Sequence, residues 1–313
     1  MAEEFCDPAV PTIPGGHAGL RLMTPVTPAS PCSLLCPLCH ALGPTTLLAW
    51  PERSLRKCSR CGVAFLDPRP CRSELDAFFA EEYISTDQDV EVRFGTRPEN
   101  YLRKVASFIH RHKSGGRILD LGCAGGHFLD RFFPAPAWEK WGVDLSKFAA
   151  ARARAKGIRV PSGDITSAIL PRGEFDVVTV LDTFFYFLEP WRELEAVRRA
   201  LKPDGLLVIT APSAAVHIWR NRGWRAKLFR QSQSPLLQTH HLFFYNPRTM
   251  ASLLGRSQFR MVAVRPLPAT AQGSLLRNAA AGGYFAASLA AWELSRFRIM
   301  LAPRFMVAAV PCS

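Results

Sequence analysis

Four cysteines stand in two closely spaced pairs, Cys36 with Cys39 and Cys58 with Cys61, and 18 residues separate the pairs. Each Cys-x-x-Cys pair can present two thiolates from one tight turn, and two such turns together form the tetrahedral sulfur cage that zinc prefers. Four thiolates leave no open coordination position, so the expected zinc site is structural. A redox pair or an iron site is the alternative interpretation. We therefore predict a small zinc ribbon over residues 31–70.

A second group of residues combines small side chains with carboxylates. The segment from Ile118 to Gly126 reads Ile-Leu-Asp-Leu-Gly-Cys-Ala-Gly-Gly and joins an apolar run to a helical pattern. Small residues at such a junction let a ligand approach the backbone, and the following helix offers free N–H groups. Asp144 and Asp164 come later in similar positions, and a carboxylate is a two-oxygen acceptor suited to paired hydroxyls. One aspartate alone could simply cap a turn, but three in order favour one shared ligand.

The same glycine segment excludes two common nucleotide-binding sites. A phosphate-binding P-loop needs Gly-Lys-Ser/Thr, and no such sequence follows. A dinucleotide fingerprint needs Gly-x-Gly-x-x-Gly, whereas the glycines here stand at 122, 125 and 126. The expected ligand is therefore neither a triphosphate in a P-loop nor a dinucleotide.

From Arg117 onward, apolar runs alternate with helical patterns, which predicts an α/β fold with a doubly wound, mostly parallel sheet. The helices are expected at 126–133, 148–156 and 191–201. Seven strands are expected, at 117–121, 141–144, 158–160, 175–181, 206–210, 259–264 and 305–310.

Composition and periodicity divide the chain into five parts. We expect a disordered tail over 1–30, the zinc ribbon over 31–70, a helical linker over 71–112, the ligand-binding domain over 113–270, and a C-terminal helix and final strand over 271–313.

The segment from Asp120 to Gly126 resembles motif I of class I S-adenosylmethionine-dependent methyltransferases, usually Asp-x-Gly-x-Gly-x-Gly, with Ala124 in place of the middle glycine. The resemblance implies a Rossmann-like domain and S-adenosylmethionine as cofactor. It implies that Asp144 accepts both ribose hydroxyls and that Asp164 receives the adenine amino group. The implied cofactor-binding set is Asp120, Gly122, Cys123, Ala124, Gly126, Asp144, Leu145, Asp164, Ile165 and Leu181.

The resemblance leaves the catalytic residues less defined. Many relatives carry Glu-His after the fourth strand, where this sequence reads Phe185-Tyr186. Tyr186, with its aromatic neighbours, would then form a wall beside the methyl group or simply pack in the core. A family segment of the form His-x-x-x-Phe resembles the stretch containing His240 and His241, and His241 matches it best. The catalytic candidates are therefore His241, His240 and Tyr186, and a loop histidine bonded to backbone is the alternative.

The ribbon followed by Phe65-Leu-Asp-Pro-Arg-Pro70 is similar to a subgroup of ribbon-bearing methyltransferases that act on sugars and natural products. The net charge is +13, and residues 205–292 contain ten Lys or Arg and no Asp or Glu. This asymmetry favours an anionic partner. The predicted function is methyl transfer to a small or lipid-linked anionic metabolite such as a sugar, with the acceptor atom left open. The alternatives are an RNA methyltransferase, which adds nucleic acid as a partner, and a non-catalytic accessory protein that binds the cofactor.

The basic and aromatic segment from His217 to Arg230 is expected to form a lid over that substrate, or else an amphipathic helix that packs inward. Glu3 and Glu4 stand where a signal peptide has basic residues, which predicts a cytoplasmic protein. The longest apolar stretch, Ala279 to Trp292, has 14 residues. A transmembrane helix needs about 20 residues, so peripheral contact is the membrane interaction that remains open.

Overall fold

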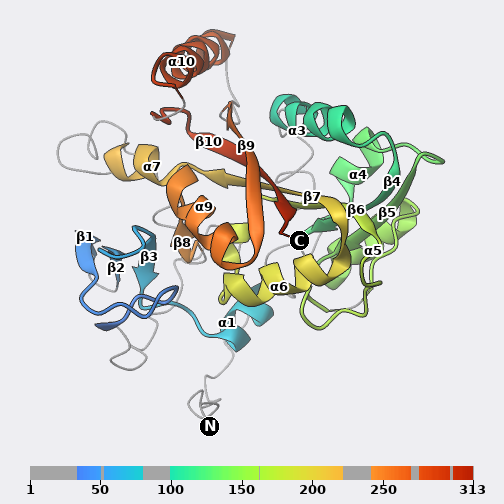
Figure 1. Ribbon diagram of the computed structural model, residues 1–313, viewed down its shortest axis with the longest axis horizontal. Coiled ribbons are helices and arrows are strands. Elements are labelled where there is room, and N and C mark those ends of the chain that lie inside the picture. The colour runs from blue at the N-terminus through green and yellow to red at the C-terminus, as the bar shows by residue number, and fades with distance from the viewer. Residues whose placement is uncertain are drawn as a thin grey trace, which may run out of the picture.

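The computed structural model describes residues 34–50, 53–79, 99–161, 163–220, 241–268, 275–296 and 299–312. These residues form two sheets (Figure 1), a larger one of order β5-β4-β6-β7-β10-β9 and a smaller one of order β1-β2-β3-β8. The strands β5, β4, β6 and β7 are parallel to one another, and β10 runs antiparallel to both of its neighbours, β7 and β9. The larger sheet comprises β4 (Gly116–Leu121), β5 (Trp138–Val143), β6 (Phe175–Leu181), β7 (Leu201–Pro212), β9 (Phe259–Leu267) and β10 (Arg304–Pro311).

Helices cover both faces of the larger sheet, because successive side chains along each buried strand point to opposite sides. One apolar core joins one set of strand side chains to α6 (Pro190–Ala200) and α9 (Pro247–Arg256). A second core joins the other set to α3 (Glu99–His112), α4 (His127–Phe132) and α5 (Lys147–Ala155). The remaining described helices are α1 (Arg72–Ala77), the short η4 (Phe184–Tyr186), α7 (Ala214–Arg220) and α10 (Leu275–Leu294).

The prediction of seven strands was wrong, because the larger sheet has six. The expected third strand, 158–160, makes only one isolated bridge, between Arg159 and Trp141. The carbonyl of Val160 accepts hydrogen bonds from the Arg154 side chain at 2.9 and 2.7 Å instead of joining a strand ladder. Pro161 then offers no N–H, so pairing cannot continue.

The last strand, β10, lies between β7 and β9 in the middle of the antiparallel half. The helix α3, which the sequence places in a linker, packs onto the same sheet through Tyr101, Val105 and Ile109, all at most 2% exposed. Residues on both sides of the predicted central domain therefore contribute to its core. Among the described helices, none is both long and apolar enough to cross a membrane.

In the smaller sheet, Cys58 and Cys61 lie in the turn between the second and third strands, and Cys36 and Cys39 precede the first strand. Its strands are β1 (Thr45–Ala49), β2 (Ser54–Lys57), β3 (Ala64–Asp67) and β8 (Phe243–Phe244). The strand β8 comes from far along the chain and pairs antiparallel with β3, Phe65 opposite Phe243. The backbone N–H of Leu66 also donates to the carbonyl of Leu242 at 3.1 Å. The N-terminal sheet is thus completed by the segment that directly follows His241.

Candidate functional site

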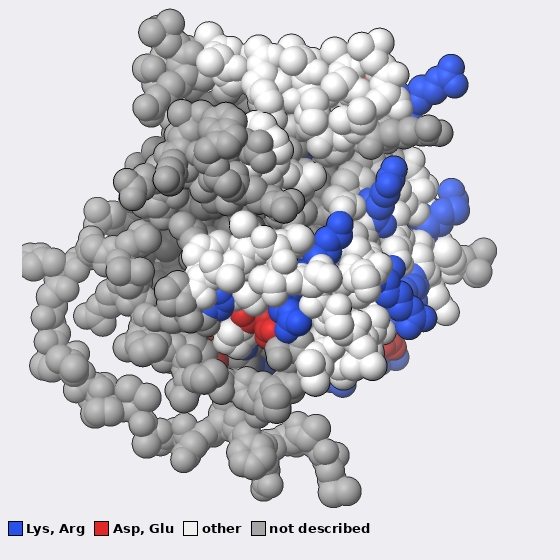
Figure 2. All heavy atoms as spheres, turned by 90° about the vertical axis from the view of Figure 1, so that its left-hand side faces the viewer, with Lys and Arg blue, Asp and Glu red and all other residues white. Residues whose placement is uncertain are grey.

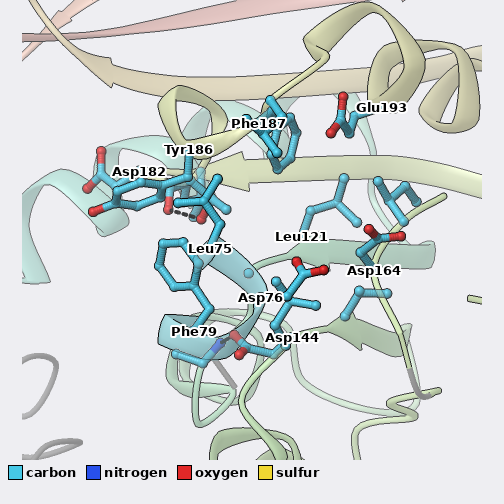
Figure 3. A pocket seen from close by; sticks show the side chains of 18 of the residues that line it. Leu75, Asp76, Phe79, Leu121, Asp144, Asp164, Asp182, Tyr186, Phe187 and Glu193 are labelled. Carbon is cyan, nitrogen blue, oxygen red and sulfur yellow. Dashed lines mark hydrogen bonds between the residues drawn. The ribbon is translucent and has the colours of Figure 1, made fainter. Parts of the chain in front are cut away.

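A pocket opens where the parallel strands β4, β5 and β6 end (Figure 3). Ligands of open α/β sheets bind at this edge, because the loops there leave a crevice between neighbouring strands. The helix α1 and the segment after η4 form the other walls. The lining residues are Arg72, Leu75, Asp76, Phe79, Leu121, Gly122, Ala124, Val143, Asp144, Leu145, Asp164, Ile165, Leu181, Asp182, Thr183, Tyr186, Phe187, Leu188 and Glu193.

The loop after β4 is shaped by residues with positive φ. Gly122 has a φ of +75°, and a Cβ added there would overlap the Thr183 hydroxyl oxygen. Its N–H donates to the carbonyl of Val143 at 2.7 Å, which ties the loop to β5. Ala124 also has a positive φ, of 48°. Position 122 therefore requires glycine, because any side chain would be both strained and obstructed.

Asp144 follows β5 and faces the pocket. One carboxylate oxygen accepts from the N–H of Ala124 at 2.8 Å, and the other accepts from the N–H of Ser146 at 2.9 Å. Burial raises the pKa of Asp144 to about 6, although these two backbone hydrogen bonds oppose the shift. Each carboxylate oxygen can accept a further hydrogen bond, so the group both holds the glycine loop and offers acceptors to a ligand.

Asp120 lies below the pocket and does not line it. Its carboxylate is 3% exposed and accepts from the Thr179 hydroxyl at 2.6 Å. Burial raises its pKa to about 7, the Thr179 hydrogen bond lowers it, and the charge of Asp144 raises it again. The Cys123 side chain is buried against Gly142, and Gly126 packs against Ile158, which belongs to the same apolar core as Cys123. Asp120, Cys123 and Gly126 therefore support the wall, whereas the other seven predicted cofactor residues line it.

Asp164 stands at one side of the pocket and is already hydrogen-bonded. Its Oδ1 accepts from the N–H and hydroxyl groups of Thr166 and Ser167, at 2.7 to 2.9 Å. Its Oδ2 lies 3.2 Å from the Arg72 guanidinium of α1. Burial alone would raise the pKa of Asp164, but the Thr166 and Ser167 hydrogen bonds outweigh it, and the pKa is lowered.

Several lining residues were not predicted from the sequence. The helical pattern around Glu74–Phe79 was recognised, but nothing in it indicates that Arg72, Asp76 and Phe79 face a pocket. Glu193 was taken as part of an amphipathic helix. Asp182 carried a usable signal, since it directly follows β6 as Asp144 follows β5.

Asp182 is anchored to the fold. Its carboxylate accepts from the hydroxyls of Tyr101 and Thr210, each at 3.1 Å, and forms an ion pair with Arg304. These partners come from α3, β7 and β10. Its role is therefore to hold the end of β6 against its neighbours, so that the pocket-facing segment after it is fixed.

Tyr186 and His241 form a pair at the opposite side of the pocket from Asp164. The Tyr186 hydroxyl lies 3.2 Å from Nε2 of His241. Tyr186 lines the pocket and contacts Phe79 edge to face, with ring centroids 5.0 Å apart. His241 is only 6% exposed and packs on the ring of Phe185 at 4.1 Å. His241 thus reaches the pocket through Tyr186, while His240 and most of the predicted lid, 221–230, lie outside the described residues.

The four paired cysteines lie close together. All four sulfur atoms lie within 4.8 Å of one another, with Cys36 to Cys61 at 3.6 Å and Cys39 to Cys58 at 3.5 Å. Tetrahedral zinc with sulfur ligands at about 2.3 Å requires sulfur atoms roughly 3.8 Å apart. The donor set and its spacing therefore fit a zinc ion.

A family comparison covers most of the larger sheet. Residues 94–264 match a model described as a methyltransferase domain. The chain belongs to this methyltransferase family. The pocket at the ends of β4, β5 and β6 lies within the matched residues, apart from the wall formed by α1.

Curated relatives match a shorter segment of this methyltransferase. The ubiquinone biosynthesis O-methyltransferase of Methylococcus capsulatus is 29% identical over 139 residues, which cover 42% of this chain and 58% of the relative. The corresponding protein of Paraburkholderia phymatum is 32% identical over 31% of this chain and 44% of its own length. The tRNA U34 carboxymethyltransferase of Idiomarina loihiensis is 28% identical over 31% of this chain and 32% of its own length. The chain thus spans about half the length, or less, of these relatives.

Solved structures show the same fold at low sequence identity. A Haloferax volcanii methyltransferase complex with the Trm112 activator matches with a TM-score of 0.51 and 17% identity, covering 78% of this chain and 100% of that chain. The Burkholderia thailandensis 1,6-didemethyltoxoflavin-N1-methyltransferase, solved with S-adenosylhomocysteine bound, matches with a TM-score of 0.51 and 15% identity, covering 86% and 100%. Both support an α/β fold with a mostly parallel central sheet.

Proposed function

We propose that this methyltransferase transfers the methyl group of S-adenosylmethionine to a hydroxyl of a small or lipid-linked acceptor. The observation that carries the proposal is the Asp144 carboxylate, placed at the end of β5 beside the glycine loop. Asp144 would accept the two ribose hydroxyls, and the apolar side chains of Leu145, Ile165 and Leu181 would flank the adenine ring. Gly122 and Ala124 would let the amino-acid end of the cofactor approach the backbone. The bound cofactor supplies an electrophilic methyl group on its sulfonium.

The Tyr186–His241 pair supplies the proton acceptor in this proposal. A hydroxyl acceptor beside Tyr186 would give its proton to the phenol oxygen while the phenol proton passes to Nε2 of His241 across 3.2 Å. Tyr186 is the residue that touches the acceptor, and His241 acts through it. Alignment of acceptor and methyl group contributes much of the rate enhancement, and the ring contacts of Tyr186 with Phe79 and Phe185 fix its position.

The aromatic side chains of the pocket support a ring-bearing acceptor, and only the basic surface favours an anionic one, because the charged side chains that line the pocket are Arg72 and five acids. Phe79, Tyr186 and Phe187 form an aromatic wall that suits a sugar or phenol ring. On the face shown in Figure 2, basic side chains outnumber acidic ones among the described residues. The chain as a whole carries a net charge of +13. A relative named as a tRNA carboxymethyltransferase keeps RNA as the alternative acceptor, and a non-catalytic accessory role is the second alternative.

The test of this function uses the full chain with labelled S-adenosylmethionine. Calorimetry should detect S-adenosylhomocysteine binding, and label should reach phenolic or sugar acceptors in preference to RNA. Label found only in RNA, with salt-sensitive RNA binding, would replace the proposed acceptor. Cofactor binding without transfer to any fraction of a cell extract would support the accessory role, and no cofactor binding would overturn the proposal.

Cofactor affinity should fall as the pH is lowered. Ribose hydroxyls donate to an ionised carboxylate, and the pKa of Asp144 is raised to about 6. At pH 5 about nine-tenths of this group would be protonated, so S-adenosylhomocysteine should bind about ten-fold more weakly than at pH 8. The effect of the same group on folding stability has the opposite sign. The pKa of Asp144 is higher in the folded state than in the unfolded state, so this carboxyl favours folding at low pH and loses that contribution as the pH rises through about 6. Titration of Asp144 should therefore not unfold the protein at pH 5, and the weaker S-adenosylhomocysteine binding should not result from unfolding. Thermal unfolding measured at each pH checks this.

The pH effect has a direct comparison. The variant Asp144→Asn has no titratable group at this position. It should bind S-adenosylhomocysteine more weakly than wild type, and its dissociation constant should change little between pH 5 and pH 8. A wild-type dissociation constant that stays constant between pH 5 and pH 8 would contradict the assignment of Asp144.

We propose further that Cys36, Cys39, Cys58 and Cys61 hold a structural zinc ion. The variant Cys58→Ser should lose most of its zinc and unfold at a temperature lower by about 5 °C or more, because the metal contributes directly to folding. Bound metal is measured by elemental analysis and unfolding by calorimetry. Cys312→Ser is the matched control, since Cys312 is exposed and lies in the final segment. The proposal would be contradicted if the purified wild-type protein contained no zinc and if added zinc did not change its unfolding temperature.

A further inference from the structure

The consecutive elements α9 and β9 carry positive charge that no described acid neutralises. Residues 241–268 contain four arginines and no Asp or Glu. All four are exposed, and they are Arg248 and Arg256 of α9 and Arg260 and Arg265 of β9. Within the described part of the chain, none of the four forms an ion pair. By contrast, both exposed arginines of α6, Arg192 and Arg199, pair with nearby glutamates at 3.1 and 3.2 Å.

The turn before β1 exposes a group of large apolar side chains. Leu35 and Leu42 pair through an isolated bridge, and the N–H of Gly43 donates to the carbonyl of Leu34 at 3.0 Å. Leu34 is 62% exposed, Leu35 is 43% exposed and Leu42 is 74% exposed. These three residues form the leucine cluster. Single exposed leucines are ordinary, but several together on one turn commonly mark a surface that meets an apolar partner.

The leucine cluster and the four arginines belong to elements that contact each other. The Arg256 guanidinium donates to the carbonyl of Leu38, in the turn that the leucine cluster flanks, at 3.4 Å. A methyl group added at Gly62, after the second cysteine pair, would contact the Thr249 side chain of α9. Figure 2 views the side of the molecule on which the smaller sheet, α7 and α9 lie in Figure 1, and basic side chains gather there. We call the arginines and the leucine cluster together the basic–apolar surface.

The apolar residues of this surface distinguish between two anionic partners, a phospholipid bilayer and RNA. Single-stranded RNA is usually held by basic residues together with aromatic side chains that stack on its bases. On the described parts of the smaller sheet, α9 and β9, the exposed large apolar side chains are aliphatic, namely Val262 and the leucine cluster. Basic residues beside exposed aliphatic ones suit a bilayer interface, where the charges meet lipid phosphates and the apolar groups enter the acyl boundary.

We propose that the basic–apolar surface docks on an anionic phospholipid bilayer. The guanidinium groups would bind lipid phosphates, and the leucine cluster would enter the interface. The docking itself goes beyond the proposed function, whereas its consequence, a lipid-linked acceptor in place of a free one, rests on that function. Attraction between exposed charges is screened by salt, so the docking requires anionic lipid and weakens as the salt concentration rises.

Vesicle sedimentation tests the docking without a methyl acceptor. The full chain is mixed with phosphatidylcholine vesicles that contain either no phosphatidylglycerol or about 30% of it. We expect binding to the anionic vesicles alone. Changing both Arg260→Gln and Arg265→Gln should weaken that binding about ten-fold or more, because each basic residue near an anionic surface adds to the attraction. Arg192→Gln with Arg199→Gln is the matched control, since it removes the same charge from paired arginines of α6 and should keep the binding.

A second variant tests the apolar part of the surface. Leu42→Ser should weaken vesicle binding about three-fold or more, because a polar side chain gains nothing from entering the interface. Ile169→Ser is its control, since Ile169 is 92% exposed and lies outside this surface, and it should bind like wild type. Thermal unfolding checks that each variant is folded.

The outcomes separate the docking from the proposed function. The inference would be overturned if the wild-type chain did not bind anionic vesicles, or if the α6 control weakened binding as much as the β9 variant. Binding to RNA and not to vesicles, weakened by the β9 variant, would also overturn it and make RNA the partner. Vesicle binding by a chain that does not bind S-adenosylhomocysteine would support the docking and reject the proposed function.

Discussion

Replacing Asp144 with alanine is expected to weaken S-adenosylhomocysteine binding by about 10²- to 10⁴-fold. The carboxylate would accept two ribose hydroxyls, and each hydrogen bond to a charged group contributes roughly 1.5–3 kcal/mol. It also holds the glycine loop through the N–H of Ala124 at 2.8 Å, so the variant loses part of the pocket as well as the ligand contact. Calorimetric titration at pH 8 measures the effect.

Two further variants separate these contributions. Asp144→Asn keeps an oxygen that can accept from Ala124, so it should bind better than the alanine variant but worse than wild type. Asp204→Ala removes an exposed aspartate paired with Lys113 and should leave the affinity unchanged. A dissociation constant within three-fold of wild type in Asp144→Ala would remove this residue from the cofactor site.

The strands were predictable where burial leaves a clear pattern. Residues 175–181 form β6 as expected, because a strand that is covered by helices on both faces is mostly apolar, as five of these seven residues are. The glycine loop and Asp144 were also found from sequence, since small residues and acids at strand ends are local signals. The prediction of a strand at 158–160 was wrong for a local reason as well. Two of its side chains are buried, as in a strand, but its backbone pairs with β5 at Arg159 alone.

Contacts between distant segments could not be predicted in this way. The two residues of β8 pair with β3, although Phe243 and Phe65 stand far apart in sequence. Periodicity reports which side of an element is buried, and it contains no information on which distant element covers it. For the same reason α1 was recognised as helical, but its place over the pocket, with Arg72 between Asp164 and Glu193, was not.

The β3–β8 pairing connects the cysteine-rich sheet to the candidate catalytic pair. Leu66 of β3 donates to the carbonyl of Leu242, the residue after His241. The N–H of Leu242 in turn donates to the carbonyl of Phe185, next to Tyr186, at 3.0 Å. The N-terminal sheet therefore helps to hold both members of the Tyr186–His241 pair. Such support would keep the Tyr186 hydroxyl and Nε2 of His241 within hydrogen-bond distance, as the proposed proton transfer requires.

Removing either member of this pair should lower kcat by about 10²- to 10⁴-fold, the usual contribution of a positioned acid or base. In the proposed mechanism, Tyr186→Phe loses the phenol that would touch the acceptor, and His241→Ala loses the group that would receive its proton. The affinity for S-adenosylhomocysteine should change by less than about three-fold in both. Steady-state kinetics and calorimetry measure the two quantities, and Tyr284→Phe, which removes an exposed hydroxyl bonded to Leu301, is the matched control.

The double variant and the pH profile test whether the two residues act as one unit. If the proton passes through both, Tyr186→Phe combined with His241→Ala should be about as slow as either single variant. We expect the kcat of the wild-type chain to fall on the acid side of its pH profile, and this fall should be absent in His241→Ala, which has no imidazole at this position. Additive losses in the double variant, or an unchanged acid limb, would mean that His241 only packs beneath Phe185 and that Tyr186 acts without it.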